Sequence, residues 1–190
     1  MTPFDGNLVA LSRTVSHALR HEPEAYGLVL DSEGWVDVNV LLAAIGKKNE
    51  SLQGATEQQL VEILATSEKT RFEVRDRRAR ARYGHSVKQK IDHQRVDEPP
   101  RTLFHGTAAR NRDSILEKGL LPSGRQFVHL SGDRALAMKV GRRHGDPIVF
   151  LVDTAAAQAQ GIQFFIVDDD VYLADRIPAA ALTLDRTADS

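Results

Sequence analysis

A polar segment with paired prolines near the middle of the chain divides the sequence into two parts. The segment, residues 93–102, reads "HQRVDEPPRT" and contains Pro99 and Pro100. Polar stretches with prolines are typical of connections between domains, and the hydrophobic pattern differs on the two sides of this one. A chain of 190 residues is long enough for two small domains. We therefore expect one domain at residues 1–92, a linker at residues 93–102 and a second domain at residues 103–190.

The first part of the chain has the apolar spacing of helices. Apolar residues recur three and four positions apart, which is the period of an amphipathic helix. Asn7 is a candidate N-cap for the first helix, and a second helix begins after Trp35 and ends at Gly46. A third begins at Thr56, with Gln59 three residues later as in a capping box. The pattern predicts three helices.

A basic stretch that follows them, "TRFEVRDRRARARYG" at residues 70–84, has the alternation of a β-hairpin. Phe72 and Val74 alternate with polar residues, a turn is expected near Asp76–Arg77, and the return strand runs through Ala79 and Ala81. Three helices and a basic hairpin make up a winged helix, which often presents its hairpin to nucleic acid. We expect this architecture for the first domain.

The second part of the chain consists mostly of short apolar runs separated by turns rather than by helices. This pattern favours an α+β domain with a mixed or antiparallel sheet over a doubly wound parallel sheet. The expected strands are residues 102–107, 125–131, 147–153, 162–167, 171–175 and 180–184, and the expected helices are residues 108–118 and 133–144.

The amino-acid composition excludes several kinds of protein and of functional site. Hydrophobic residues make up 42% of the chain and charged residues 27%, as in ordinary globular proteins. No cysteine is present, which excludes disulfides, thiolate metal sites and thiol catalysis. The sequence starts without a basic and then apolar leader, and no apolar run approaches the roughly 18 residues of a membrane helix. We expect a soluble, cytoplasmic monomer with no membrane contact.

The net charge of −1 hides a division of charge along the chain. Residues 71–90 carry eight Lys or Arg against two acids, whereas residues 145–190 carry eight Asp against Arg176 and Arg186. This asymmetry indicates a local anionic ligand rather than general binding of polyanions.

Four short stretches combine cationic or hydroxyl side chains with special backbone positions. Each has an ordinary structural explanation by itself; Arg20 and His21, for example, suit the negative end of a helix dipole. Arg125 and His129 lie four residues apart on an expected strand and would share a face. The stretches are "LRH" at 19–21, "RARARYGHS" at 78–86, "FHGT" at 104–107 and "RQFVHLS" at 125–131.

The chemistry common to these stretches is positive charge or hydrogen-bond donation without an obvious carboxylate base. Phosphate binding and electrostatic stabilisation suit such groups better than proton abstraction does. GxGxxG, P-loop and HExxH motifs are absent, and the acidic run Asp168–Asp170 is typical of a solvated turn. Because the histidines are scattered, we expect no metal site.

Several ordered motifs strongly resemble the RNA 2'-phosphotransferase (tRNA 2'-phosphotransferase) family. The resemblance runs from about residue 8 to about residue 180. Its motifs are "LSRTVSHALRHEPEAYGLVLDSEGWVDVNVLL", "RFEV" with "RARARYGHS", "LFHGTAARNRDSILEKGLLPSGRQFVHLS", "VGRRHGDPIVFLVD" and "VYLADRIP".

This resemblance implies a winged-helix RNA lobe joined to a lobe with the ADP-ribosyltransferase fold. It also implies a reaction in which NAD is consumed and no metal is needed. The 2'-phosphate of an RNA attacks the anomeric carbon of the nicotinamide ribose and expels nicotinamide, giving an ADP-ribosylated RNA phosphate. The ribose 2''-hydroxyl then attacks that phosphorus, which releases RNA with a 2'-hydroxyl and ADP-ribose 1'',2''-cyclic phosphate.

The resemblance assigns site residues by position. The family's Arg-His pair matches Arg20 and His21, and its two further arginines match Arg80 and Arg125. These four residues would converge on one phosphate, with His21 either hydrogen-bonding the phosphate or moving a proton. The residues that would bind NAD are His105, Gly106, Thr107, His129, Ser131 and Val171, the last at a position where many relatives carry glutamate.

Two positions depart from the family pattern, and two other functions stay open. Phe127 stands where a histidine is expected, and Tyr83 stands where a glutamine is common; both flank assigned catalytic positions. An ADP-ribosyltransferase that modifies phosphorylated RNA or DNA ends would stop after the first step. A winged-helix nucleic-acid binder without catalysis would not release nicotinamide.

Overall fold

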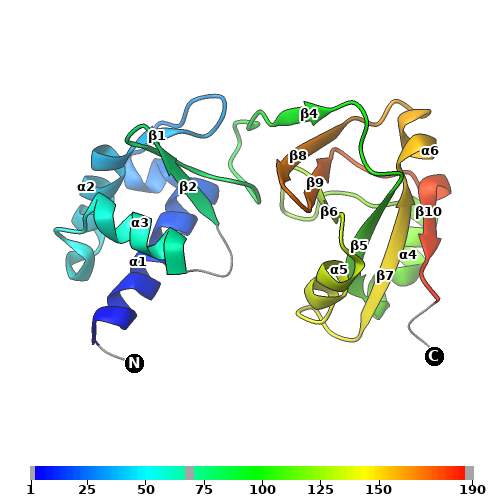
Figure 1. Cartoon of the computed structure of the whole chain (residues 1–190), viewed down its shortest axis with the longest axis horizontal. Coiled ribbons are helices and arrows are strands. Elements are labelled where there is room, and N and C mark those ends of the chain that lie inside the picture. The colour runs from blue at the N-terminus through cyan, green and yellow to red at the C-terminus, as the bar shows by residue number, and fades with distance from the viewer. Residues whose placement is uncertain (1–2, 67–70, 187–190) are drawn as a thin grey trace. The chain divides into compact units, whose positions relative to one another are not determined.

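The computed structural model describes residues 3–66 and 71–186, and Figure 1 shows their helices and strands. The chain forms two compact units, residues 1–92 and residues 93–190. Both units combine helices with antiparallel strands, so the predicted α+β class is confirmed at that level. None of the helices in the described residues has the length and apolar character needed to cross a lipid bilayer.

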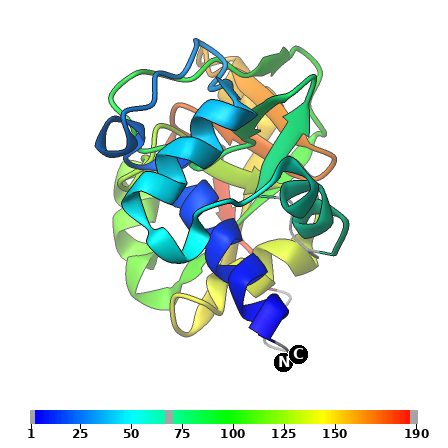
Figure 2. The same cartoon turned by 90° about the vertical axis from the view of Figure 1, so that its left-hand side faces the viewer.

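The first unit packs three α-helices against a small antiparallel sheet with strand order β1-β3-β2 (Figure 2). Its core is apolar, with Val15 and Leu19 of α1, Leu41 of α2, Leu60 of α3 and Phe72 of β2 at most 1% exposed. The elements are α1 Pro3–Arg20, the 3-10 turn η1 Pro23–Tyr26, β1 Val36–Asp37, α2 Val38–Lys48, η2 Glu50–Leu52, α3 Glu57–Thr66, β2 Phe72–Arg75 and β3 Arg78–Ala81.

Two predicted helix boundaries in this unit are wrong. Helix α1 begins at Pro3 rather than after Asn7, because proline suits the first turn of a helix. Helix α2 continues through Gly46 to Lys48. Gly46 is buried, and a Cβ there would lie 3.2 Å from the Cα of Gln53, so this glycine admits a close neighbour rather than ending the helix.

The predicted local signals of α3 and of the hairpin are confirmed. The backbone N–H of Thr56 donates to Oε1 of Gln59 at 2.9 Å, and the N–H of Gln59 donates back to Oγ1 of Thr56 at 3.4 Å. Asp76 and Arg77 form the hairpin turn with φ values of 51° and 60°. Such positive φ at both central residues matches the turn to the twist of the two strands.

The second unit contains a seven-stranded antiparallel sheet, counted over the described residues, with strand order β10-β7-β5-β6-β9-β8-β4. Leu103, Phe150, Phe164 and Leu173 are fully buried in it. The elements are β4 Gln94–Val96, β5 Thr102–Ala108, η3 Ala109–Asn111, α4 Arg112–Lys118, β6 Val128–Ser131, α5 Arg134–Gly141, β7 Pro147–Asp153, α6 Thr154–Gln158, β8 Phe164–Asp168, β9 Val171–Ala174, η4 Ala179–Ala181 and β10 Leu182–Leu184.

Several segments of the second unit differ from the sequence-based expectation. The expected helix 108–118 is α-helical only from Arg112, the expected helix 133–144 ends at Gly141, and α6 forms where no helix is expected. Two further differences concern β4 and β6. Residues 94–96, inside the expected linker, form β4 and pair with β8; this short, mostly exposed edge strand has too little apolar alternation to be recognised. Strand β6 begins only at Val128. Arg125 therefore lies before the strand, and the interpretation that Arg125 and His129 share a strand face is wrong.

Candidate functional site

Arg20 and His21 lie where α1 ends, at the negative end of the helix dipole. The Arg20 side chain donates from Nη2 to the backbone carbonyl of Arg71, just before β2, at 2.6 Å. Its guanidinium carbon is 5.4 Å from the centre of the Tyr83 ring, within the range of a cation–π contact. The helix end is thus joined to the segments on both sides of the hairpin.

The ring of His21 is fixed by the segment that follows β3. Its Nδ1 is 2.8 Å from the Ser86 hydroxyl, which is hydrogen-bond distance. The backbone N–H of Ser86 also donates to the carbonyl of Arg20 at 2.9 Å. Ser86 therefore binds both the backbone of the helix end and the side chain of the candidate catalytic histidine.

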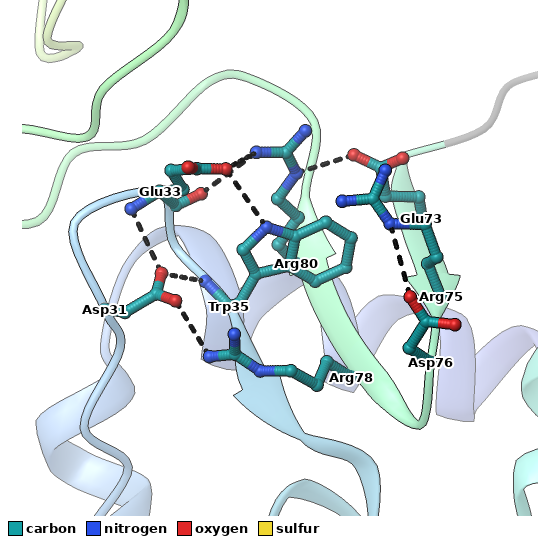
Figure 3. A network of polar contacts seen from close by, with 8 residues as sticks. All are labelled: Asp31, Glu33, Trp35, Glu73, Arg75, Asp76, Arg78 and Arg80. Atoms are coloured by element: carbon teal, nitrogen blue, oxygen red, sulfur yellow. Dashed lines mark hydrogen bonds and ion pairs between the residues drawn. The ribbon is translucent and has the colours of Figure 1, made fainter.

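Arg80 lies on β3 at the centre of a polar network (Figure 3). Its Nε donates to Oε1 of Glu73 at 2.6 Å, and its Nη1 donates to Oε2 of Glu33 at 3.2 Å. The guanidinium carbon lies 4.5 Å from the centre of the Trp35 ring. The Arg80 side chain is 26% exposed, so solvent still reaches part of it.

The loop that carries Glu33 and Trp35 is shaped by Asp31. One carboxylate oxygen of Asp31 accepts the backbone N–H groups of Glu33 at 3.0 Å and Trp35 at 2.8 Å. Its other oxygen accepts from Nη2 of Arg78 at 2.8 Å. Burial acts to raise the pKa of Asp31, but hydrogen bonds from Trp35, Arg78 and Glu33 hold that pKa below its ordinary value. Asp31 therefore stays negatively charged, and its hydrogen bonds fix the shape of this loop.

His105 is the candidate site residue of the second unit whose protonation state the structure defines. Its Nδ1 lies 3.0 Å from the backbone carbonyl of His129. Because a carbonyl only accepts, Nδ1 carries the proton and Nε2 has an available lone pair in the neutral ring. Burial lowers the pKa of His105, against the opposing effect of the His129 carbonyl. A neutral imidazole with an accepting Nε2 suits a hydroxyl group of a ligand.

The other candidate residues near His105 have structural contacts of their own. A Cβ on Gly106 would lie 1.7 Å from the carbonyl oxygen of Ala137, so this glycine lets α5 pack directly on β5. Thr107 is 7% exposed, and its hydroxyl accepts from Nδ2 of Asn111 at 3.0 Å. These contacts position the strand end around His105.

Ser131 and Val171 are register partners on β6 and β9. The Ser131 hydroxyl is buried and accepts the backbone N–H of Asp133 at 3.1 Å, directly before α5. Asp133 in turn caps α5 by accepting from Ala135 and Leu136. Ser131 thus connects the middle of the sheet to the start of α5.

Arg125 and Phe127 lie in the bend before β6. Phe127 is 4% exposed, and its ring packs edge-on against the rings of His93 and Phe165, with centre-to-centre distances of 5.4 and 5.5 Å. The phenylalanine at this position therefore belongs to the core of the second unit, and Arg125 stands two residues before it, outside the strand.

The structure brings Arg20 and His21 together with Tyr83 and Ser86, and it brings His105 together with His129. In the described part of the chain, no group of three or more His, Cys, Asp or Glu side chains has an arrangement that would hold a metal ion. Sequence reasoning missed four residues that contact the candidate arginines and His21, namely Glu33, Trp35, Glu73 and Ser86.

One of these four could have been found from the sequence. With Asp76 and Arg77 as a two-residue turn, Glu73 is the cross-strand partner of Arg80, as the register shows. Glu33 and Trp35 give no such signal, because they reach Arg80 from a loop 47 and 45 positions away in the sequence.

A family model and several relatives that match this chain have the same description, RNA 2'-phosphotransferase. The family model described as "RNA 2'-phosphotransferase, Tpt1 / KptA family" matches residues 6–176. A "Probable RNA 2'-phosphotransferase" of Agrobacterium fabrum is 47% identical over 183 residues, which cover 95% of each chain. Proteins of the same description from Acetivibrio thermocellus and Thermococcus kodakarensis are 45% and 39% identical, over 89% and 92% of this chain and 92% and 95% of theirs.

Proposed function

Because the chain belongs to the RNA 2'-phosphotransferase family, we propose that it removes an internal 2'-phosphate from RNA and that NAD is consumed as the co-substrate. The family match, residues 6–176, covers most of both compact units, residues 1–92 and residues 93–190. Under this proposal the first unit is a winged-helix RNA lobe and the second an ADP-ribosyltransferase-like lobe. Three helices with a basic hairpin support the former, and the mixed content of strands and short helices supports the latter.

The proposed reaction has two balanced steps. A 2'-phosphate oxygen of the RNA bonds to the anomeric carbon of the nicotinamide ribose, the bond to nicotinamide breaks, and nicotinamide leaves. The 2''-hydroxyl of the transferred ribose then bonds to phosphorus, the bond from phosphorus to the RNA 2'-oxygen breaks, and that oxygen takes up a proton. The products are RNA with a 2'-hydroxyl and ADP-ribose 1'',2''-cyclic phosphate.

The observation that carries this proposal is the fixed arrangement of Arg20 and His21. Arg20 uses Nη2 on the Arg71 carbonyl and lies near Tyr83, while His21 is held at Nδ1 by Ser86. Side chains that only cap a helix dipole need no such contacts from distant segments. Arginine suits a phosphate because its planar fork engages two oxygens and stays charged.

The protonation state of His105 in the second unit fits the binding of a dinucleotide co-substrate. His105 is neutral near pH 7 because burial lowers its pKa, and the proton on Nδ1 leaves Nε2 to accept from a hydroxyl such as that of a ribose. Gly106 and Thr107 hold the β5 strand end in place. Under the proposal, these residues bind and orient NAD, which supplies the ribose carbon that the phosphate attacks.

One experiment separates the candidate functions. The protein is incubated with NAD and an RNA oligonucleotide that carries one internal 2'-phosphate and a 5'-terminal phosphate, and the products are resolved by mass. We expect nicotinamide, dephosphorylated RNA and a cyclic phosphate of ADP-ribose. An oligonucleotide that lacks the 2'-phosphate should give neither nicotinamide nor the cyclic phosphate. A stable ADP-ribosylated end would indicate the one-step transferase, and binding without nicotinamide release would indicate a nucleic-acid binder.

The assignment of Arg125 to this reaction has its own test. We expect Arg125→Ala to slow turnover about 100-fold, the scale on which removal of a preorganised charge-stabilising donor acts. Because Arg125 lies in a bend outside β6, its replacement should leave thermal unfolding nearly unchanged. Wild-type turnover in this variant would remove Arg125 from the site.

A further inference from the structure

Two carboxylates hold Arg80 from different elements. Glu73 stands directly opposite Arg80 across the β2–β3 pair, and Glu33 reaches it from the loop before β1 (Figure 3). The guanidinium carbon of Arg80 lies over the ring of Trp35, within the range of a cation–π contact. Trp35 is 5% exposed and donates from Nε1 to Oε2 of Glu33 at 3.4 Å. The guanidinium is thus held at its edge by two acids and on its face by a ring.

The contacts leave a defined part of Arg80 available. Nε is used by Glu73 and Nη1 by Glu33, whereas Nη2 takes part in neither ion pair. An arginine side chain has several soft torsions, and ordering it at the moment of binding costs free energy. With two N–H groups already held, Arg80 presents Nη2 in one fixed direction.

The net charge of this cluster bears on the role of the two acids. Two acids beside one guanidinium leave the cluster of Arg80, Glu33 and Glu73 with a formal charge of −1, which opposes the approach of an anionic phosphate. If the acids had no other role, replacing one by its neutral amide would strengthen phosphate binding and would not slow the reaction. A positioning role predicts the opposite effect on rate.

We propose that Glu33 and Glu73 are positioning residues that hold the Arg80 guanidinium against Trp35, so that Nη2 points to the phosphate being transferred. This proposal rests on the proposed function. The acids act through Arg80 and do not touch the substrate. Their fixed hold on the arginine places its charge before the reaction begins, which is how an oriented group lowers a barrier.

The test compares the steady-state kinetics of Glu73→Gln and Glu33→Gln with those of Asp76→Asn. Asp76 is a matched control, because it lies on the same hairpin and its replacement removes one negative charge, while its ion-pair partner is Arg75. We expect Glu73→Gln to lower the rate at saturating RNA about 10-fold without raising the KM for RNA. We expect Asp76→Asn to have the wild-type rate.

A double substitution shows whether Glu73 acts through Arg80. In an Arg80→Ala background, adding Glu73→Gln should cause no further loss of rate, since coupled residues are not additive. Independent losses that multiply would overturn the proposal. An unchanged or faster rate in Glu73→Gln, with a lower KM for RNA, would overturn it as well, because the acids would then only repel phosphate.

A measurement on the free protein separates failure of this proposal from failure of the proposed function. The Nε–H of Arg80, assigned by its loss in Arg80→Ala, should exchange slowly in ¹⁵N NMR spectra of the wild type and fast in Glu73→Gln. Slow exchange in both proteins would show that Glu73 does not hold the Arg80 guanidinium, and it would overturn the proposal whatever the catalytic activity is. A wild-type protein that shows the expected exchange, yet removes no 2'-phosphate from the RNA and forms no cyclic phosphate of ADP-ribose, would refute the proposed function instead.

Discussion

At the scale of single residues, Ser86 has no assigned role, yet it contacts both Arg20 and His21. Its hydroxyl lies 2.8 Å from Nδ1 of His21, and its backbone N–H binds the carbonyl of Arg20. A hydroxyl can donate or accept, so this contact fixes the ring orientation in either tautomer of His21. Whether His21 hydrogen-bonds the phosphate or moves a proton, its other ring nitrogen, Nε2, must be oriented toward the reacting group.

We expect Ser86→Ala to slow turnover roughly 10-fold, because the His21 ring loses the contact that orients it. The backbone N–H to Arg20 remains, so unfolding should change by no more than about 1 kcal/mol. Ser86→Thr keeps the hydroxyl and should recover most of the rate. Equal losses in both variants would show that the site senses the shape of the side chain rather than its hydrogen bond.

His105 gives the folded protein a dependence on pH that can be isolated. Burial lowers its pKa below the ordinary value of about 6.5, and the charge of His144 acts in the same direction. The unfolded chain therefore binds the proton more readily than the folded one. Stability is fully present above about pH 6.5 and is lost as the pH falls from there through the folded pKa of His105.

The measurement compares urea unfolding of the wild type and of His105→Asn from pH 7.5 to pH 5. Asparagine keeps a donor for the carbonyl of His129 but cannot take up a proton in this range. We expect the wild type to lose more free energy of unfolding than the variant over this interval. Parallel curves would mean that His105 titrates alike in the folded and unfolded chains.

At the scale of elements, the packing of α5 on β5 depends on a missing side chain. Gly106 on β5 faces the carbonyl of Ala137, and a Cβ there would approach it to 1.7 Å, a distance at which backbone must move. A Cβ on Gly141, at the end of α5, would lie 3.0 Å from the carbonyl oxygen of Thr107, which is a tight contact but not an overlap of this size. This pair of glycines brings the helix to the strand that carries His105.

We expect Gly106→Ala to lower the free energy of unfolding by at least about 2 kcal/mol, since the overlap is with backbone that cannot rotate away. In a unit of this size, that corresponds to a fall in Tm on the order of 10 °C. Gly54→Asn is the control, because Gly54 has φ of 78° with open space around it, and asparagine tolerates this conformation. Similar losses in the two variants would contradict the packing argument.

The elements that the sequence predicts well are those with local causes. The capping box of Thr56 and Gln59 and the turn at Asp76–Arg77 involve residues within three positions of each other, and both form as expected. Arg125 shows the opposite case. Its run reads as one strand from 125 to 131, but the ring of Phe127 packs against His93 and Phe165, and β6 begins after it. Tertiary packing decides such boundaries.

The candidate site follows the same division. The resemblance to the family assigns Arg20, His21 and Arg80 as candidate site residues, whereas the groups that hold them come from distant segments. Glu33 contacts Arg80 from a loop whose shape depends on Asp31 accepting two backbone N–H groups. A contact of this kind forms only when the loop has folded, so it cannot be predicted from the pattern of residues along the chain.

At the scale of the whole molecule, the proposed reaction places different electrical demands on its two steps. Departure of nicotinamide develops positive charge on the ribose, which an arginine does not stabilise directly. Attack on phosphorus gathers negative charge on the phosphate oxygens, which arginines stabilise well. The first step therefore needs the 2'-phosphate to be placed more than it needs its charge neutralised, and several contacts can share that placement.

Loss of one cation at the end of α1 should consequently slow the second step more than the first. We expect Arg20→Ala and His21→Ala to accumulate the ADP-ribosylated RNA, visible as a slower band that precedes product on a denaturing gel. Arg20→Lys should rescue the second step only in part, because an ammonium group lacks the planar fork. Arg13→Ala removes an exposed arginine of the same helix and should behave as wild type. If intermediate and product fall in equal proportion in both alanine variants, these side chains act in binding or in the first step, and this division of labour is wrong.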